Sequence, residues 1–257
     1  MIVINPTYEA LRARLSTPEE LVHSGTLIHK GRNELYVTEV EGVRLCIKCF
    51  GFSNRLKRFI YRYLRSSKGE RAWQNSMRLR AAGFATPEPV AYIQENSIWG
   101  IERSYYICLY QEGKTLYQWG EQSLETIREG VMNLAHFAAG LHDARLLLCD
   151  FTPGNILLSP QGFVLVDTNR MRFKPVSDRE GLRNMAGLWL SPEAASLLAR
   201  TYGALRDANP EQCEKWYAAD RSHFWKRFAS RHHLTDSITH HDLDGSQYTY
   251  DFKTTIR

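Results

Sequence analysis

The sequence predicts an α+β fold of two lobes, with antiparallel strands in the first lobe and mainly helices in the second. Three observations carry this prediction. Alternating apolar residues over 26–50, interrupted by short turns, indicate strands joined by hairpins. Apolar residues at helical spacing over 123–142, and again beyond Asp178, indicate helices. The stretch 148–167 has the pattern of turn, strand, turn and strand, which predicts a hairpin set among those helices.

The chain is long enough for two lobes with cores of their own, since it has 257 residues. We place the boundary so that residues 1–111 form the N-lobe and residues 112–257 the C-lobe. Its 43% hydrophobic and 24% charged residues are typical of a soluble globular protein. No apolar run reaches the length of a membrane span, and the start of the chain lacks a basic region and is broken by Pro6. We therefore expect a cytoplasmic protein.

The cysteines and the net charge narrow the class further. The five cysteines are scattered and odd in number, which argues against a disulfide framework. Cys46 and Cys49 have metal-ligand spacing, but residues three apart in a strand point to opposite faces, so free thiols are expected. The net charge of +5 favours an anionic partner such as a nucleotide, a phosphorylated sugar or an acidic lipid, without choosing among them.

The N-lobe is expected to contain helices as well as the sheet. One of them runs from about Lys68 to Ala82, with Gly83 as its C-terminal signal and Pro87 beyond it. The expected strands of the lobe are residues 26–30, 34–40, 43–50, 89–95 and 103–110.

Lys48 is unusual because it lies in an otherwise apolar strand. Alternation places its side chain on the face opposite Leu45 and Ile47. An ammonium group on an inward face needs a partner, which nucleotide phosphates and a helix carboxylate would supply. The alternative is a lysine on an edge strand in water. Glu70 is the only acid in the following helix, and Gln74, one turn later on the same face, could equally occupy the facing position.

The strongest pattern lies at 148–167. Asp150 and Asn155 flank a tight Pro-Gly turn, and Asp167 follows the second apolar strand. A strand–turn–strand unit of this length folds back on itself, so we expect the three side chains to converge. Their oxygens suit Mg²⁺, which takes one or two carboxylates and completes its shell with substrate phosphates. One carboxylate would remain to accept a proton from a hydroxyl group.

These residues resemble the protein-kinase-like superfamily. Asp150 and Asn155 match its catalytic-loop Asp and Asn, and Asp167 matches the Asp of its D-F-G motif. The run D-F-T-P-G-N-I-L at 150–157 is similar to bacterial small-molecule and sugar kinases, most closely the lipopolysaccharide kinases that phosphorylate Kdo or heptose. The resemblance covers about residues 26–175 by motif.

The resemblance implies an ATP- and Mg²⁺-dependent phosphotransferase with a two-lobed protein-kinase-like fold. Asp150 would be the catalytic residue, and Asn155 and Asp167 would hold the metal. Residues expected at the nucleotide are Lys48 on the phosphates, Glu70 paired with Lys48, Gly31 in the turn over the phosphates, and Glu112 in the hinge 110–113 at the adenine edge. The acceptor would be Kdo or heptose of the lipopolysaccharide inner core, at the cytoplasmic face of the inner membrane of a Gram-negative bacterium.

Two groups of basic residues allow more than one interpretation of their role. Residues 55–65 form a helix pattern with arginines on one face, which suits either peripheral contact with an anionic membrane or a solvated surface. Arg170 and Arg172, with Lys174, could bind an anionic group of the acceptor or be solvated loop charges. We expect a sugar or glycolipid as partner and no nucleic acid, and the oligomeric state stays open.

Three other functions remain. A soluble kinase of the aminoglycoside or choline type would share every motif. A protein kinase is less favoured, because Leu148 and Cys149 replace its His-Arg and Thr168 and Asn169 replace its Phe-Gly. The third is a nucleotide-binding pseudokinase scaffold, which the missing His-Arg favours and the retained acidic residues oppose.

Beyond residue 178 the pattern predicts helices to about Phe228, with Trp189, Trp216 and Trp225 as core anchors. The histidine-rich end of the chain is expected to be a polar terminal segment rather than a metal site, because it lacks a zinc-binding pattern.

Overall fold

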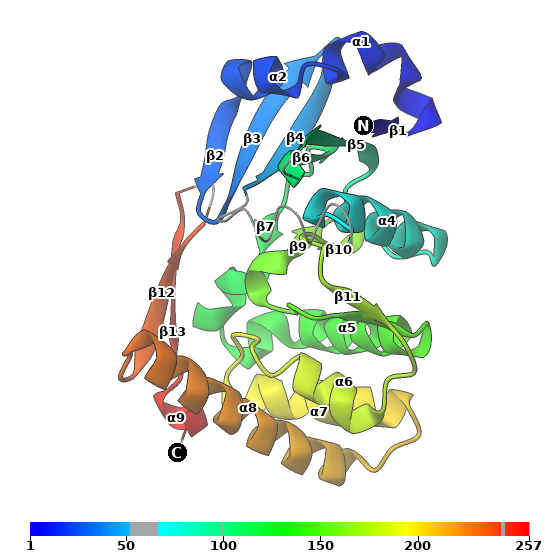
Figure 1. Cartoon of the computed structure of the whole chain (residues 1–257). Coiled ribbons are helices and arrows are strands. Elements are labelled where there is room, and N and C mark those ends of the chain that lie inside the picture. Colours follow the sequence, from blue (N-terminus) through cyan, green and yellow to red (C-terminus); the bar gives the residue numbers. More distant parts are fainter. Residues whose placement is uncertain (52–65, 99, 243–244, 257) are drawn as a thin grey trace. The chain divides into compact units, whose positions relative to one another are not determined.

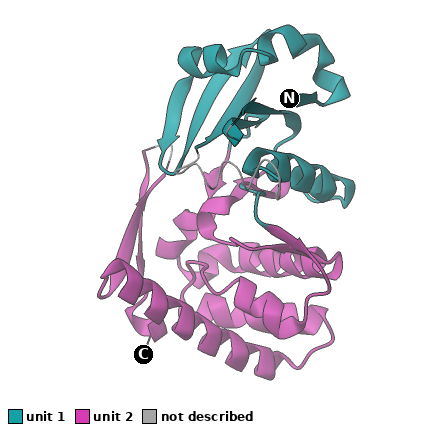
Figure 2. Cartoon of the chain, in the orientation of Figure 1, with its two compact units in different colours: residues 1–112, 167–170 teal, residues 113–166, 171–257 magenta. Residues whose placement is uncertain are grey.

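The computed structural model describes residues 1–51, 66–98, 100–242 and 245–256. The predicted basic helix at 55–65 lies outside the described residues. The chain divides into two compact units, one of Met1–Glu112 with Asp167–Arg170 and one of Gly113–Val166 with Met171–Arg257 (Figure 2). Among the described helices, none is both long and apolar enough to cross a bilayer.

The first unit is built on a six-stranded sheet whose strands follow the order β1-β5-β6-β4-β3-β2 (Figure 1). Every neighbouring pair is antiparallel, as hairpin connections predict. The strands are β1 (Ile2–Ile4), β2 (Thr26–Lys30), β3 (Asn33–Val40), β4 (Val43–Phe50), β5 (Pro89–Ser97) and β6 (Gly100–Leu109).

The helices of the first unit bury apolar side chains against this sheet. Leu15, Leu45 and Ile107 are fully buried in one core cluster. The helices are η1 (Pro6–Leu11), α1 (Arg12–Leu15), α2 (Pro18–Ser24) and α4 (Lys68–Ala81). Helix α4 begins where the Ser67 hydroxyl accepts a hydrogen bond from the Glu70 amide at 3.1 Å, which is a standard N-cap.

The segment Asp167–Arg170 belongs to the first unit, although the predicted boundary placed it in the C-lobe with all of residues 112–257. Its buried residue Thr168 finds its hydrogen-bond partners on α4. The Asn75 amide donates to the Thr168 carbonyl at 2.7 Å, and the Ser76 and Thr168 hydroxyls are 2.8 Å apart. A single boundary along the sequence cannot assign this short segment to the first unit, because the hydrogen-bond partners of Thr168 on α4 are more than 90 residues earlier in the chain.

The second unit is mainly helical, as predicted, with short strand pairs among the helices. Its three small sheets are β10-β9-β7, β11-β8 and β12-β13. The helices are η2 (Leu116–Glu121), α5 (Leu124–Asp143), η3 (Pro153–Asn155), α6 (Asp178–Asn184), α7 (Pro192–Leu205), α8 (Pro210–His232) and α9 (Lys253–Ile256). The strands are β7 (Lys114–Thr115), β8 (Leu146–Leu148), β9 (Ile156–Ser159), β10 (Gly162–Leu165), β11 (Met171–Phe173), β12 (Ser237–His241) and β13 (Gln247–Asp251).

An aromatic core cluster supports this unit. Trp189 and Trp225 are buried in it, as predicted, and the Trp225 ring stacks on Phe252 with centroids 5.3 Å apart. Trp216 is only partly buried, with the Arg179 guanidinium 5.9 Å from its ring centroid, so the prediction that it anchors the core is wrong. The buried stripe of α8 passes through Tyr217 instead, one position along the helix.

The end of the chain folds into a hairpin, which the prediction of a polar terminal segment did not include. Strands β12 and β13 pair antiparallel, with His240 opposite Tyr248. Tyr250 and Phe252 are buried in the aromatic cluster. The alternation of Tyr248, Tyr250 and Phe252 with polar residues is a strand signal that the histidine-rich composition obscured.

Candidate active site

The turn that follows β8 is closed around one carbonyl group in the second unit. The Thr152 amide and the Asn155 side-chain amide both donate to the Asp150 carbonyl at 2.9 Å. Pro153 occupies the first position of the short helix η3, where its missing N–H costs nothing. Asp150 and Asn155 are therefore held on one rigid turn, and because the Nδ2 end of Asn155 is engaged, its Oδ1 is the end left to act as a ligand.

The hairpin after this turn leads directly to Asp167. Strands β9 and β10 pair with Leu165 opposite Ile156, as the spacing predicted. The Val166 amide then donates to the Asn155 carbonyl at 2.9 Å. Val166 follows β10 and ends this segment of the second unit, and Asp167 is the next residue of the chain.

Asp167 is bound within the first unit by two side chains. Its Oδ1 lies 2.5 Å from the Lys48 ammonium and also accepts a hydrogen bond from the Asn169 amide. Its backbone has a φ of +55°, in the left-handed region that non-glycine residues rarely adopt. Such strain persists when the neighbours determine the conformation, as the buried Thr168 does here, and it is a common feature of functional positions.

Lys48 lies on a central strand, so the alternative of an edge-strand lysine is wrong. Strand β4 is bordered by β3 and β6, and Lys48 is opposite Leu35 and Tyr106. Its side chain is only 14% exposed. Burial makes an unpaired ammonium costly, and the Asp167 carboxylate provides the compensating charge.

Glu70 does not pair with Lys48 in this structure, contrary to the prediction. Its carboxylate accepts a hydrogen bond from the Gln74 amide at 3.1 Å, one turn along α4, and this contact is exposed. The side chains that α4 buries are on another face, which carries Ala72, Asn75, Ser76 and Leu79. The sequence spacing could not distinguish these faces because most of α4 is polar.

Two further predicted nucleotide residues have partners in the first unit. The Gly31 amide, in the turn between β2 and β3, donates to the Asn33 carbonyl at 3.2 Å. The Glu112 carboxylate lies 2.5 Å from Arg44, whose guanidinium covers the Tyr110 ring at 4.3 Å. These contacts order the turn and the end of the unit, and the roles of Gly31 and Glu112 at a nucleotide stay predictions.

The cationic residues that follow Asp167 are divided between the two units. Arg170 belongs to the first unit, whereas Arg172 is on β11 of the second unit, opposite Leu147. Both side chains are exposed. Lys174 pairs with the Glu180 carboxylate at 2.6 Å, so its charge is compensated locally. Acceptor binding by Arg170 and Arg172 stays a prediction.

His142 and Asn184 support the turn at 150–155, and sequence reasoning did not identify these contacts. The Asn184 amide donates to the Leu148 carbonyl at 2.8 Å, two residues before Asp150. His142 Nε2 lies 3.4 Å from Asn184 Oδ1, and its Nδ1 lies 2.9 Å from the Tyr202 hydroxyl. Burial lowers the pKa of His142 to about 4, so its imidazole is neutral near pH 7.

Tyr117 is the second supporting residue that the sequence did not reveal. A Cβ at Gly154 would lie 2.8 Å from the Tyr117 ring, so glycine is required for the turn to approach this ring. The opposite contacts of Tyr117 are His240, stacked at 3.8 Å between centroids, and Trp189 at 4.5 Å. The terminal hairpin therefore packs behind the turn at 150–155 through the Tyr117 ring.

The donor types of two side chains suit the Mg²⁺ that the sequence resemblance implies. Asp167 offers a carboxylate and Asn155 an amide oxygen, both hard donors. Within the described residues, no group of three or more His, Cys, Asp or Glu side chains could hold a metal ion.

Comparison with solved structures places the chain among proteins with a protein-kinase-like fold. WaaP in complex with acyl carrier protein matches with a TM-score of 0.60 and 19% identity over 90% of this chain and 98% of that one. An aminoglycoside-3'-phosphotransferase of type VIII matches with a TM-score of 0.56 and 13% identity, over 81% of this chain and 97% of that one. No protein-family model and no curated protein sequence matches the chain. The fold predicted from the sequence is confirmed.

Proposed function

We propose that this protein is an ATP-dependent kinase that phosphorylates a sugar hydroxyl, of Kdo or heptose, in the lipopolysaccharide inner core. The observation that carries the proposal is the ion pair of Lys48 and Asp167. An ordinary surface hairpin would not need a buried lysine paired with the aspartate that follows its second strand. The ordered set of Lys48, Asp150, Asn155 and Asp167 on a kinase-like fold supports phosphoryl transfer.

In the proposed reaction, Lys48 and Asp167 of the first unit would bind the nucleotide, while Asp150 of the second unit would act on the acceptor and Asn155 on the metal. Asp150 orients the acceptor hydroxyl and takes its proton while the hydroxyl oxygen bonds to the γ-phosphorus and ADP leaves. Lys48 exchanges part of its pairing with Asp167 for the nucleotide phosphates. Asn155 and Asp167 would hold Mg²⁺, which would supply neutralisation of the phosphate charge.

Both similar structures are phosphotransferases that act on hydroxyl groups, and WaaP is a kinase of the lipopolysaccharide core. That similarity, together with the D-F-T-P-G-N-I-L run, supports a core sugar as the acceptor. We further propose that the protein works at the cytoplasmic face of the inner membrane.

A soluble small-molecule kinase is the second candidate, favoured by the match to the aminoglycoside phosphotransferase. A pseudokinase scaffold is the third, favoured by the missing pair between Lys48 and the carboxylate of α4. The three candidates differ in acceptor and in turnover, so one assay separates them.

The test is transfer of labelled phosphate from ATP to lipid A–Kdo and heptosyl-core acceptors, with aminoglycosides and choline in parallel. We expect label on a core acceptor with wild type and none with Asp150→Ala. Label on an aminoglycoside or choline alone would establish the second candidate. Nucleotide binding without transfer to any acceptor would favour the scaffold.

A further inference from the structure

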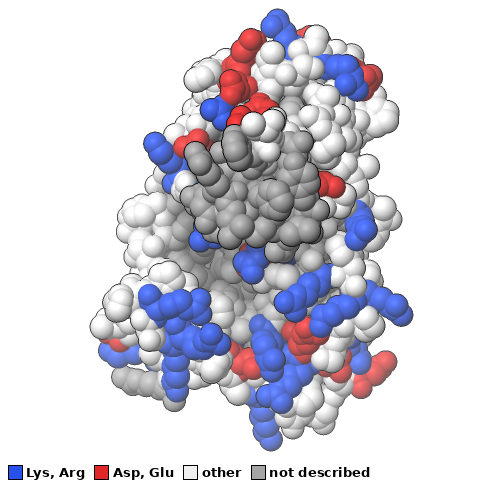
Figure 3. Space-filling view, viewed as in Figure 1, with Lys and Arg blue, Asp and Glu red and all other residues white. Residues whose placement is uncertain are grey.

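Helix α8 carries a basic stripe that the proposed reaction does not use. Between Asp220 and Asp236 the sequence contains no acid, while Lys226, Arg227 and Arg231 add positive charge. Figure 3 shows Lys and Arg side chains gathered over the part of this face that α8 crosses in Figure 1. The stripe belongs to the second unit, and none of its residues is in the predicted active site.

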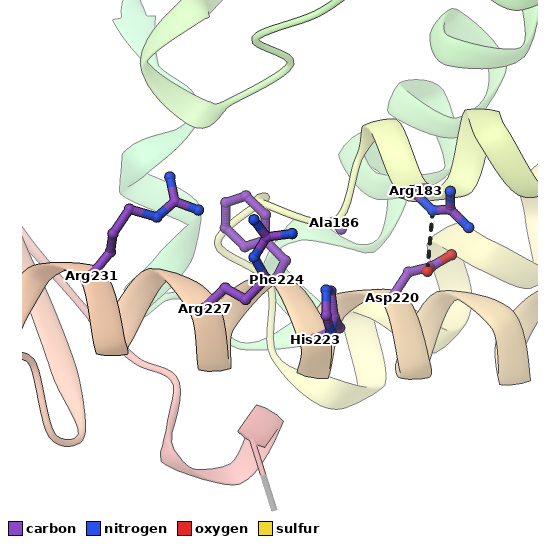
Figure 4. A pocket seen from close by; sticks show the side chains of 7 residues that line it. All are labelled: Arg183, Ala186, Asp220, His223, Phe224, Arg227 and Arg231. Atoms are coloured by element: carbon purple, nitrogen blue, oxygen red, sulfur yellow. Dashed lines mark hydrogen bonds and ion pairs between the residues drawn. The ribbon is translucent and has the colours of Figure 1, made fainter.

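The stripe forms one wall of a pocket of about 490 Å³ (Figure 4). Asp220, His223, Phe224, Arg227 and Arg231 come from α8, at positions that share one side of the helix. The opposite wall consists of Arg183, at the end of α6, and Ala186. The hollow is therefore built from two segments of one unit.

The floor of the pocket is rigid. A Cβ at Gly187 would lie 2.9 Å from the Phe224 ring, so the backbone at Gly187 packs closely against this ring. Arg183 Nε lies 3.3 Å from the Asp220 carboxylate, which connects the two walls. The Asp220 side chain is only 13% exposed, so its carboxylate mainly holds Arg183 in place and adds little negative charge to the surface of the pocket.

The remaining charge of the pocket is positive and uncompensated. In the part of the chain that the structure describes, the side chains of Arg227 and Arg231 make no ion pair and no hydrogen bond with another residue. Both side chains extend from α8 to the same side in Figure 4. Two neighbouring guanidinium groups attract an anion, and each offers paired N–H donors that match phosphate oxygens.

A phosphomonoester suits this pocket better than a carboxylate. Its charge of roughly −1.5 to −2 at pH 7 balances two arginines, whereas a carboxylate balances one. The pocket is larger than a phosphate group, and its volume lies in the range of about 300–1,000 Å³ usual for small-molecule sites. The Phe224 ring offers an apolar face to the rest of such a molecule.

We propose that this pocket between α6 and α8 binds a phosphorylated sugar through Arg227 and Arg231. The same phosphate chemistry occurs in lipid headgroups, but the hollow shape and the ring at its floor favour a soluble ligand of sugar size. The proposal does not rest on the kinase reaction.

The test is calorimetric titration of the full chain with glucose 6-phosphate, without Mg²⁺ and at about 0.1 M salt to limit screening. Glucose serves as the uncharged comparison. We expect wild type to bind the phosphate ester and not glucose, and Arg227→Gln/Arg231→Gln to bind at least about tenfold more weakly. The melting temperature of each variant shows whether it is folded. If the double variant does not fold, the single variant Arg231→Gln is used in its place.

Two matched variants make the result specific. Lys226→Gln removes an exposed charge of α8 outside the pocket and should leave affinity within about twofold. Lys48→Met removes the nucleotide-phosphate lysine and should also leave it unchanged. Equal weakening by Lys226→Gln, loss of binding with Lys48→Met, or no binding by wild type would overturn the proposal. So would arginine-dependent binding to phosphatidic acid vesicles without binding of glucose 6-phosphate.

Discussion

The turn at 150–155 in the second unit and the Lys48–Asp167 pair of the first unit reach their geometry in different ways. The turn is closed by backbone and side-chain bonds among Asp150, Thr152 and Asn155, within a few residues. The pair joins two side chains from distant parts of the sequence. A local turn depends mainly on its own residues, whereas a long-range pair depends on every strand and helix that supports it.

Replacing the catalytic carboxylate should have the largest effect on activity. Asp150→Asn keeps the carbonyl that closes the turn but removes the proton acceptor, so we expect kcat to fall roughly 10²- to 10⁴-fold. The unfolding free energy should change by less than about 1 kcal/mol. Steady-state kinetics and denaturant titration measure both quantities, and a variant with full activity would rule out this role for Asp150.

Because buried His142 supports the turn at 150–155, the stability of the protein should depend on pH. The pKa of His142 is about 4 in the folded protein and has its ordinary value of 6.5 when unfolded. Because the folded pKa is the lower one, the unfolded state binds the proton first as pH falls. Stability is therefore complete above about pH 6.5 and decreases toward pH 4, by up to about 3 kcal/mol.

His142→Gln tests this expectation, because glutamine has no titrating group. The variant should lose most of the slope of unfolding free energy against pH between about 4 and 6.5. His136→Gln, at an exposed position on the same helix α5, is the matched control and should retain the slope. Equal slopes in all three proteins would contradict the role assigned to His142.

The long-range pair should show coupling that the turn lacks. Lys48→Met and Asp167→Asn each leave a partly buried charge without its partner, while the double variant leaves none. We expect a coupling free energy of about 1–2 kcal/mol in a double-mutant cycle of unfolding, reduced by the partial exposure of Asp167. Additive effects would mean that the pair contributes nothing to the first unit.

The smallest effect is expected at Glu70. Because its carboxylate bonds Gln74 and not Lys48, Glu70→Gln should change KM for ATP by less than about threefold. Lys48→Met measured beside it should raise KM for ATP far more. A large effect of Glu70→Gln would mean that α4 turns this carboxylate toward the nucleotide when ATP binds.

Much of the fold followed from local pattern. Alternation identified the strands of the first unit, and helical spacing identified α4, α5 and the helical region beyond Asp178. The spacing of Asp150, Asn155 and Asp167 predicted the hairpin between them. The missed terminal hairpin is the exception, since its strand signal is short and mixed with histidines.

The sequence by itself determined the elements and the turn, because the propensities and hydrogen bonds that form them act over a few residues. Only the tertiary structure decided the partners of Lys48, Glu70 and Thr168, and the ring of Tyr117 behind Gly154. It also brought Arg183 to the pocket of α8. The physical reason is that burial and charge compensation depend on which surfaces the chain packs together, and residues far apart in the sequence carry no local sign of that choice.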